Sequence, residues 1–272
     1  MPVVLTAIDD RGVATLTLNR PEVGNAYDDG MLGGIVDACG SLAADARVRA
    51  LLLRGAGRHF QAGADLGWLK RVAALTPAEN HAFSGLTIAA MRAIDAFPRP
   101  TIALVHGGCF GGGTGFVAAC DIAVATEDAQ FAISEVKFGV SPLPMVMQLA
   151  RSMGLPQLRR WAITAERFDA RRAERMGFVH ELCAPGGLDA AAAPIVDAIL
   201  AAGPEAVAET KRLTRALTGT AVDDALAERL TDVAAARRQS AEAAEGLSSF
   251  LEKRPPAWSV SPANQDGKGL PR

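Results

Sequence analysis

Two glycine-containing loops hold the backbone groups best suited to chemistry. Residues 59–66 (HFQAGADL) follow a run typical of a strand, and residues 110–113 (FGGG) lie between a strand pattern and a helix pattern. Small residues let backbone N–H groups approach a ligand closely, and a helix N-terminus adds partial positive charge. Two such amides converging on one point would form an oxyanion hole. Considered alone, glycine loops are weak evidence for such a site, because turns and close packing are their more common explanation.

Glu135, in the segment FAISE, is the candidate acid/base group. The pKa of a carboxyl in a desolvated pocket rises, which would let Glu135 exchange protons near neutral pH. The alternative interpretation of this residue is a solvated acid on a turn or helix.

Other chemistries lack their motifs. The chain contains no GxxxxGK[ST] and no GxGxxG after its first strand pattern, which argues against a bound nucleotide or dinucleotide cofactor. The four histidines do not cluster, and neither an HExxH nor a Ser-His-Asp pattern occurs. We therefore expect no metal site and no hydrolytic triad.

Charge and cysteine usage exclude further classes of partner. Among the 272 residues, 28 Lys and Arg stand against 30 Asp and Glu, so we expect neither nucleic acid nor an anionic membrane as a partner. Four widely spaced cysteines predict free thiols in a reducing compartment. The N-terminus shows neither the basic segment nor the apolar run of a signal peptide, and we expect a soluble cytoplasmic protein.

The hydrophobic patterns predict alternating strands and helices, hence an α/β (α+β) core. Thr76-Pro77 begins a helix that should end near Phe97, before two prolines. From about Leu143 onward the pattern is almost wholly helical, and we place the core at residues 1–190 and a helical region at 191–272. The predicted strands are Val3–Ile8, Val13–Leu18, Val48–Arg54, Thr101–Val105 and Ile122–Ala125, and the other predicted helices are Asp28–Ala44 and Phe116–Cys120.

Five motifs in order along the chain resemble the crotonase superfamily, the enoyl-CoA hydratase/isomerase family. They are LNRPEVGNA (18–26), HFQAGADL (59–66), HGGCFGGGTG (106–115), CDIAVATEDAQF (120–131) and EGLSSFLEKRPPAW (245–258). The resemblance implies a spiral of repeated ββα units whose C-terminal helices form a homotrimer or a hexamer (a dimer of trimers). It also implies an acyl-CoA substrate, with coenzyme A as part of the substrate and no prosthetic group.

The resemblance assigns roles residue by residue. The backbone amides of Ala64 and Gly112 would hold the thioester oxygen, and Glu135 would move protons. The C-terminal residues Phe250 and Lys253 match positions that reach the nucleotide of a neighbouring subunit. The remaining positions that match substrate or CoA contacts are Val23, Gly24, Ala62, Asp65, Leu66 and Gly111.

One departure from the family pattern limits the reaction. The best-known hydratases carry two glutamates; the second matches Glu135, whereas the first matches Gly115, which has no side chain. Hydration of a 2-enoyl-CoA by Glu135 alone is the favoured interpretation. Δ3–Δ2 enoyl-CoA isomerisation, which needs a single carboxylate, is the alternative, and a catalytically silent acyl-CoA-binding or scaffold protein is a third.

A finer resemblance concerns the substrate. GADLGWLKR, SEVKFG, TAERFDARRAERMGFV and the ending EGLSSFLEKRPPAW resemble bacterial methylglutaconyl-CoA hydratases of leucine breakdown, or related hydratases of isoprenoid acids. A branched dicarboxylic acyl group would need a cation for its far carboxylate. The candidates are Lys70, Arg71, Arg92 and Lys137.

Overall fold

The computed structural model describes residues 2–217 and 224–259 of the chain. The chain forms two compact units, Met1–Ala193 and Pro194–Arg272. This division and the boundary expected at residue 190 both fall within helix α7 (Leu188–Ala201).

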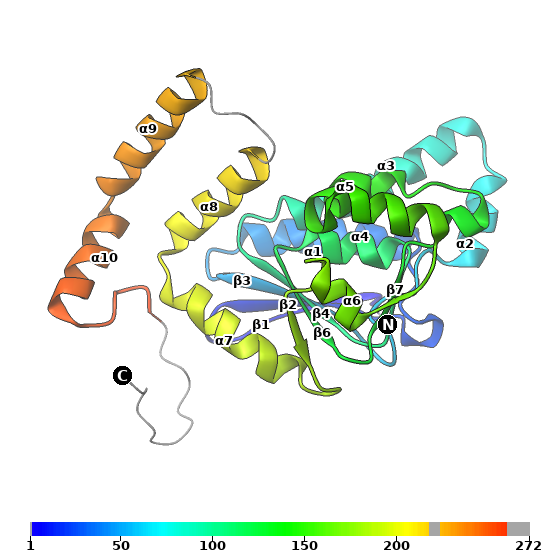
Figure 1. The fold of residues 1–272 in the computed structure, drawn as a ribbon, viewed down its shortest axis with the longest axis horizontal. Helices are drawn as coiled ribbons and strands as arrows, with labels where there is room; N and C mark the ends of the chain where they lie inside the picture. The colour runs from blue at the N-terminus through cyan, green and yellow to red at the C-terminus, as the bar shows by residue number, and fades with distance from the viewer. Residues whose placement is uncertain (1, 218–223, 260–272) are drawn as a thin grey trace. The chain divides into compact units, whose positions relative to one another are not determined.

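A six-stranded sheet forms the framework of the first unit (Figure 1). Its spatial order is β1-β2-β3-β4-β6-β9; β1 and β2 pair antiparallel, and every other neighbouring pair is parallel. Strand β4 is buried along its whole length, as its apolar sequence TIALV requires of a central strand covered on both faces. The strands are β1 (Val4–Ile8), β2 (Val13–Leu18), β3 (Ala50–Gly55), β4 (Thr101–Val105), β6 (Ile122–Thr126) and β9 (Glu181–Cys183).

A second, shorter ladder runs beside the sheet and repeats from one turn of the chain to the next. It contains β5 (Gly108–Phe110), β7 (Gln130–Ala132) and β8 (Phe168–Asp169). Isolated parallel bridges, Tyr27 to Ala64 and Gln61 to Cys109, extend the same pairing to earlier turns. Each turn therefore contributes one strand to the large sheet and one short extended segment to the second ladder, which brings the loops after these segments to one place.

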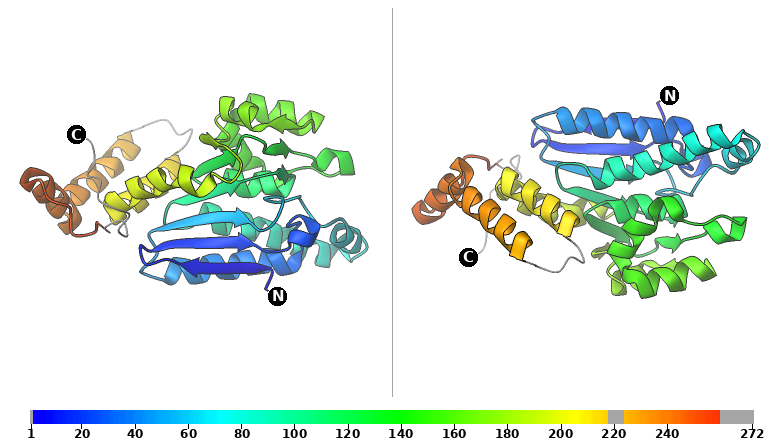
Figure 2. Two further views of the ribbon diagram at one scale, coloured as in Figure 1. Left: turned by 90° about the horizontal axis from the view of Figure 1, so that it is seen from below. Right: turned by 90° about the horizontal axis from the view of Figure 1, so that it is seen from above.

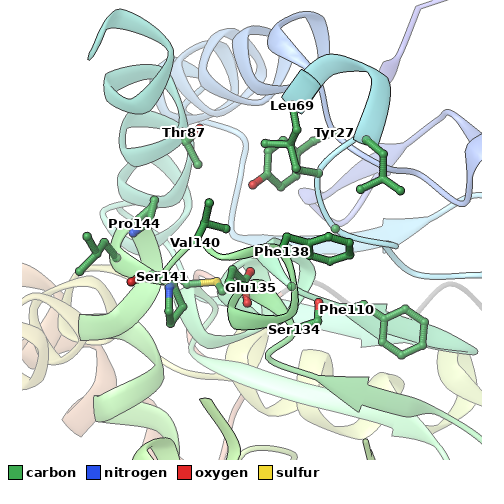
Figure 3. A pocket seen from close by; sticks show the side chains of 18 of the residues that line it. Tyr27, Leu69, Thr87, Phe110, Ser134, Glu135, Phe138, Val140, Ser141 and Pro144 are labelled. Atoms are coloured by element: carbon green, nitrogen blue, oxygen red, sulfur yellow. The ribbon is translucent and has the colours of Figure 1, made fainter. Parts of the chain in front are cut away.

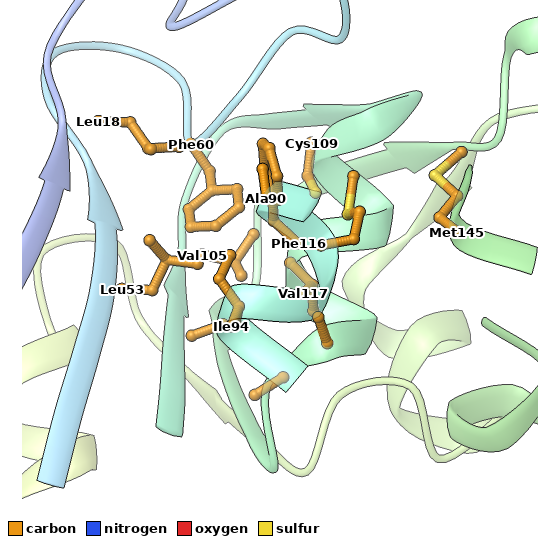
Figure 4. Close-up of a cluster of buried hydrophobic side chains, with 14 of the residues drawn as sticks. Leu18, Leu53, Phe60, Ala90, Ile94, Val105, Cys109, Phe116, Val117 and Met145 are labelled. Carbon is orange, nitrogen blue, oxygen red and sulfur yellow. The ribbon is translucent and has the colours of Figure 1, made fainter. Parts of the chain in front are cut away.

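Helices bury the apolar face of the sheet (Figure 2). Helix α1 (Asp29–Ala44) is capped by Asp28, whose carboxylate accepts a hydrogen bond from the Met31 N–H at 2.9 Å. The capping box that Thr76 and Glu79 form begins α3 (Pro77–Asp95). Side chains from α3 and α4 (Gly112–Ala119) meet strand residues and Phe60 in the buried cluster of Figure 4.

Most predicted elements of the first unit are confirmed. Strands β2 and β4 have the predicted bounds, and α1 begins one residue later than predicted because Asp28 is its cap. The expectation that the chain is almost wholly helical from about Leu143 onward is confirmed except at two short strands. Strands β8 and β9 interrupt the helices α5 (Val146–Thr164) and α6 (Ala170–Arg175), and β9 completes the edge of the large sheet beside β6. Two or three residues are too few to show alternation, so pairing with a neighbour defines these strands.

The second unit consists of helices α8 (Pro204–Leu217), α9 (Asp224–Arg238) and α10 (Ala241–Glu252) together with the end of α7. The carboxylate of Glu242 accepts hydrogen bonds from the N–H groups of Glu205 and Ala206 at the start of α8, each at 2.8 Å. Arg237 pairs with Glu205 and Glu209. Within the described ranges no single helix is long and apolar enough to cross a membrane, and only the pair α7 and α8, bent by 107°, has the required length and composition together.

Candidate active site

A cavity of about 850 Å³ lies in the first unit, where the loops that follow the short ladder meet (Figure 3). Its wall is mainly apolar, and its charged lining residues are Glu135, Lys137 and Arg167. A cavity of this size and polarity suits a ligand with an apolar portion and a few polar contacts.

The two glycine loops touch at Gly63 and Gly111. Both residues have positive φ, +96° and +51°, and a Cβ on Gly111 would lie 3.6 Å from the Gly63 Cα. Among the described residues, the backbone N–H groups of Ala64 and Gly112 have no hydrogen-bond partner. Both residues line the cavity, and Gly112 is the first residue of α4, where the helix dipole adds positive charge. The two amides that the sequence predicts to converge therefore belong to residues that line one cavity.

The Ala64 loop is held rigidly from both sides. The buried side chain of Gln61 donates to the Gly63 carbonyl and accepts from the Gly63 N–H, both at 2.8 Å. Tyr27 continues this support, because its N–H donates to the Gly63 carbonyl at 2.9 Å and its carbonyl accepts from the Asp65 N–H at 2.8 Å. The Ala64 amide between these bonds is thus preorganised.

Glu135 begins the 3-10 helix η2 (Glu135–Phe138) and faces the second glycine loop. A Cβ on Gly111 would lie 3.0 Å from its Oε1. Its Oε2 is buried and has no hydrogen-bond partner among the described residues. Burial raises the pKa of Glu135 to about 7, while backbone hydrogen bonds from Glu135 and Ser134 lower it. The predicted direction of the pKa shift is confirmed, and the solvated-acid interpretation is wrong.

Gly115, on α4, is closed off by methionines. A Cβ there would lie 2.7 Å from both Cβ and Sδ of Met145 and 2.9 Å from Cε of Met91. Met145 and Met91 line the cavity, and both are almost fully buried. The place of a first glutamate is therefore filled with apolar side chains.

The structure gathers some of the sequence-derived contact residues and separates others. The carboxylate of Asp65 caps α2 (Leu66–Ala73) by accepting from the Trp68 N–H at 2.9 Å, and it pairs with Arg20 at 3.2 Å. Val23 and Gly24 lie in the turn before Asn25, outside the cavity lining, although the Gly24 carbonyl accepts from the Ala62 N–H at 2.9 Å. The cavity itself is lined by Ala62, Ala64, Leu66, Gly111, Gly112 and Glu135.

The two C-terminal residues belong to the second unit. Phe250 is 80% exposed, and Lys253 ends α10 in the left-handed conformation with φ +55°.

Of the four candidate cations for a second substrate carboxylate, only Lys137 lines the cavity.

Sequence reasoning missed Tyr27 and Arg167, which also line the cavity. The Arg167 guanidinium stacks over the Phe110 ring at 5.1 Å. Tyr27 is the chain's single tyrosine and directly follows the motif LNRPEVGNA, a signal that could have drawn attention to it.

Comparison with known proteins identifies the family of this chain. The model of the enoyl-CoA hydratase/isomerase family matches residues 9–261. The chain belongs to this family. An enoyl-CoA hydratase from Shewanella pealeana, a solved structure, superposes with a TM-score of 0.90 at 36% identity, covering 94% of this chain and 96% of that one. The crotonase-type α/β fold expected from the sequence is thereby confirmed.

Relatives in the family have more than one reaction in their names. A crotonyl-CoA hydratase of Syntrophomonas wolfei is 31% identical over 244 residues, which cover 89% of this chain and 92% of the relative. A Delta(3,5)-Delta(2,4)-dienoyl-CoA isomerase of Dictyostelium discoideum is 29% identical over 269 residues, covering 92% of this chain and 88% of the relative. Membership in the family alone does not choose between hydration and isomerisation.

Proposed function

We propose that this protein is an enoyl-CoA hydratase that uses Glu135 as its single acid/base carboxyl. The observation that carries the proposal is the unpartnered Oε2 of Glu135 in a cavity that also contains the free amides of Ala64 and Gly112. The names of the hydratase relatives support addition of water as the reaction.

The proposed reaction has two steps and returns Glu135 to its starting state. Ionised Glu135 takes a proton from water while the water oxygen bonds to C3 of the 2-enoyl thioester. The C2–C3 π electrons move toward the thioester, whose oxygen becomes an enolate held by the Ala64 and Gly112 amides. The enolate then collapses, and C2 takes the proton from Glu135. One molecule of water has been added to one face, and each well-placed amide contributes about 3–4 kcal/mol to stabilising the enolate.

Isomerisation between 3-enoyl and 2-enoyl thioesters is the second candidate. Gly115 and its methionine cover favour it, because they leave no second carboxylate to hold the attacking water. Glu135 would then take a proton from C2 and return it to C4 through the same enolate, which requires only one carboxylate.

We further propose a branched acyl group with a second carboxylate as the substrate. Lys137 and Arg167 support this proposal, since both line the cavity and are exposed at its edge. A guanidinium and an ammonium there can hold the far carboxylate, while the apolar wall accommodates the branch.

The second unit is proposed to mediate assembly into a trimer or hexamer. Helix α10 exposes three large apolar side chains, each by at least 63%: Leu247, Phe250 and Leu251. Exposure of such side chains to water is unfavourable, and contact with another subunit would cover them. Light scattering tests assembly, and a monomer at micromolar concentration would contradict it.

Mass spectrometry of enoyl-CoA thioesters after incubation with the purified protein tests the reaction. The panel contains crotonyl-CoA, 3-methylglutaconyl-CoA and a 3-enoyl-CoA. Gain of one water on a 2-enoyl ester is the expected result, with the dicarboxylic ester turned over fastest. Conversion of the 3-enoyl ester into a product of equal mass but different chromatographic retention, and no hydration of either 2-enoyl ester, would replace the hydratase proposal by the isomerase.

A further inference from the structure

We propose that the hydroxyl of Tyr27 is a third hydrogen-bond donor to the thioester oxygen, beside the amides of Ala64 and Gly112. The inference rests on the proposed use of an oxyanion site, and it holds for hydration and isomerisation alike. Tyr27 would then be a catalytic residue, because its hydroxyl touches the reacting group.

Tyr27 contacts both amide-bearing residues. Its backbone forms the parallel bridge to Ala64. Its ring lies against Gly112, because a Cβ on Gly112 would be 2.4 Å from the Tyr27 Cε1 and 3.1 Å from its hydroxyl oxygen. The hydroxyl oxygen therefore lies beside the first residue of α4, where the Gly112 N–H is free.

The ring is fixed by its aromatic neighbours. Trp68 and Phe116 meet it edge to face, with centroid distances of 5.7 and 6.0 Å. The whole residue is only 9% exposed. A ring held in this way can present its hydroxyl in one position without losing side-chain entropy when substrate binds.

The hydroxyl is available to a ligand. No described residue forms a hydrogen bond with it, and Tyr27 lines the cavity, into which its hydroxyl points in Figure 3. The hydroxyl oxygen is open to this cavity and lacks a hydrogen-bond partner among the described residues. A bound thioester oxygen would supply that partner.

The surroundings keep this hydroxyl protonated. Burial raises the pKa of Tyr27, and the negative charge of Glu135 raises it further. Tyr27 therefore serves as a hydrogen-bond donor and not as a base.

Tyr27→Phe is the test, because it keeps the ring and removes only the hydroxyl. We measure kcat/KM, the dissociation constant of butyryl-CoA, and the infrared carbonyl band of bound [1-¹³C]butyryl-CoA, a thioester that cannot be hydrated. Thr126→Val is the matched control. It also removes a hydroxyl, one that is buried, has no hydrogen-bond partner among the described residues and lies outside the cavity lining.

The expected result for Tyr27→Phe is a fall in kcat/KM of about 10- to 100-fold, the loss expected for one hydrogen bond to a charged group. The carbonyl band should move to higher frequency because the bound carbonyl is less polarised, whereas Thr126→Val leaves it unchanged. An unmoved carbonyl band in Tyr27→Phe would overturn the inference. So would an upward shift in the pH midpoint of kcat/KM, which would show that the hydroxyl donates to Glu135. If the native protein turns over no enoyl thioester, the proposed function fails, and the carbonyl band still decides the role of Tyr27.

Discussion

Positions 115 and 135 lie on two elements of the same site, α4 and η2, and their surroundings differ in chemistry. Gly115 has no side chain, and Met145 and Met91 fill the space above it. Glu135 has a carboxylate whose Oε2 is buried without a partner. The difference agrees with the proposal that one carboxyl works alone, because methionines fill the place of a second acid at Gly115 and burial raises the pKa of Glu135 to about 7.

The largest expected effect on turnover is that of a substitution at Glu135. Glu135→Gln removes the proton-transferring group, and kcat should fall by about 10²- to 10⁴-fold. Butyryl-CoA should bind as before, because the amides remain in place. The control is Glu127→Gln, which removes an exposed carboxylate paired with Arg171 and should leave kcat unchanged. Full turnover by Glu135→Gln would show that position 135 does not define the reaction.

The next effect concerns the backbone amide of Gly112. In Gly112→Ala the new Cβ would lie 2.4 Å from the Tyr27 ring, so the ring or the amide must move. We expect kcat/KM to fall by about 10²- to 10³-fold, as for the loss of one oxyanion donor. The control is Gly33→Ala in α1, where no atom other than those of the adjoining residues and the helix's own nearby backbone lies within 4 Å of the new Cβ. Equal activities of the two variants would contradict an oxyanion role for Gly112.

The pKa of Glu135 predicts opposite pH effects on activity and stability. The carboxylate form is the base, so kcat/KM should rise with pH through a midpoint near 7. Because the folded-state pKa is raised from its ordinary value of 4.5, the free energy of unfolding should fall as pH increases from about 4.5 to 7.

Glu135→Gln should remove this loss of stability. At pH 8 the variant should be more stable than the native protein by on the order of 2–3 kcal/mol, and at pH 4 the two should be nearly equal. Urea denaturation at both pH values measures the difference. A difference independent of pH would contradict a desolvated carboxyl at position 135.

The smallest effect on turnover is expected for a substitution at Gly115. Gly115→Ala places a methyl group against Met145, and overpacking of this kind lowers the free energy of unfolding by about 1–3 kcal/mol. Turnover should fall less than in Gly112→Ala, because Gly115 does not line the cavity. Thermal denaturation and kcat together measure both effects, and a loss of turnover larger than that of Gly112→Ala would remove the distinction between the two positions.

The sequence predicted the elements that carry long apolar patterns. Val13–Leu18 alternates and forms β2, and Thr101–Val105 is continuously apolar and forms the central strand β4. The short strands β5, β7, β8 and β9 were missed because pairing with neighbours, and not local pattern, defines two- or three-residue strands.

The candidate site was predictable where a motif marks it. Ala64, Gly112 and Glu135 all line the cavity, and the departure at Gly115 is visible in the sequence. The contacts of Tyr27 were not predictable, since they depend on a bridge to Ala64 across 37 residues and on close packing against Gly112. Likewise, Asp65 belongs to a motif, but only the fold shows that its carboxylate caps α2 and pairs with Arg20.

Hydrogen exchange at C2 of bound butyryl-CoA tests the central claim most directly, because it reports proton transfer by Glu135 without requiring hydration or isomerisation. The native protein is incubated with butyryl-CoA in D₂O, and the mass of the thioester is then measured by mass spectrometry. A single carboxyl facing one side of the enolate predicts uptake of one deuterium by the native protein and by Glu127→Gln, and none by Glu135→Gln. Uptake of deuterium by Glu135→Gln at the native rate would contradict the account.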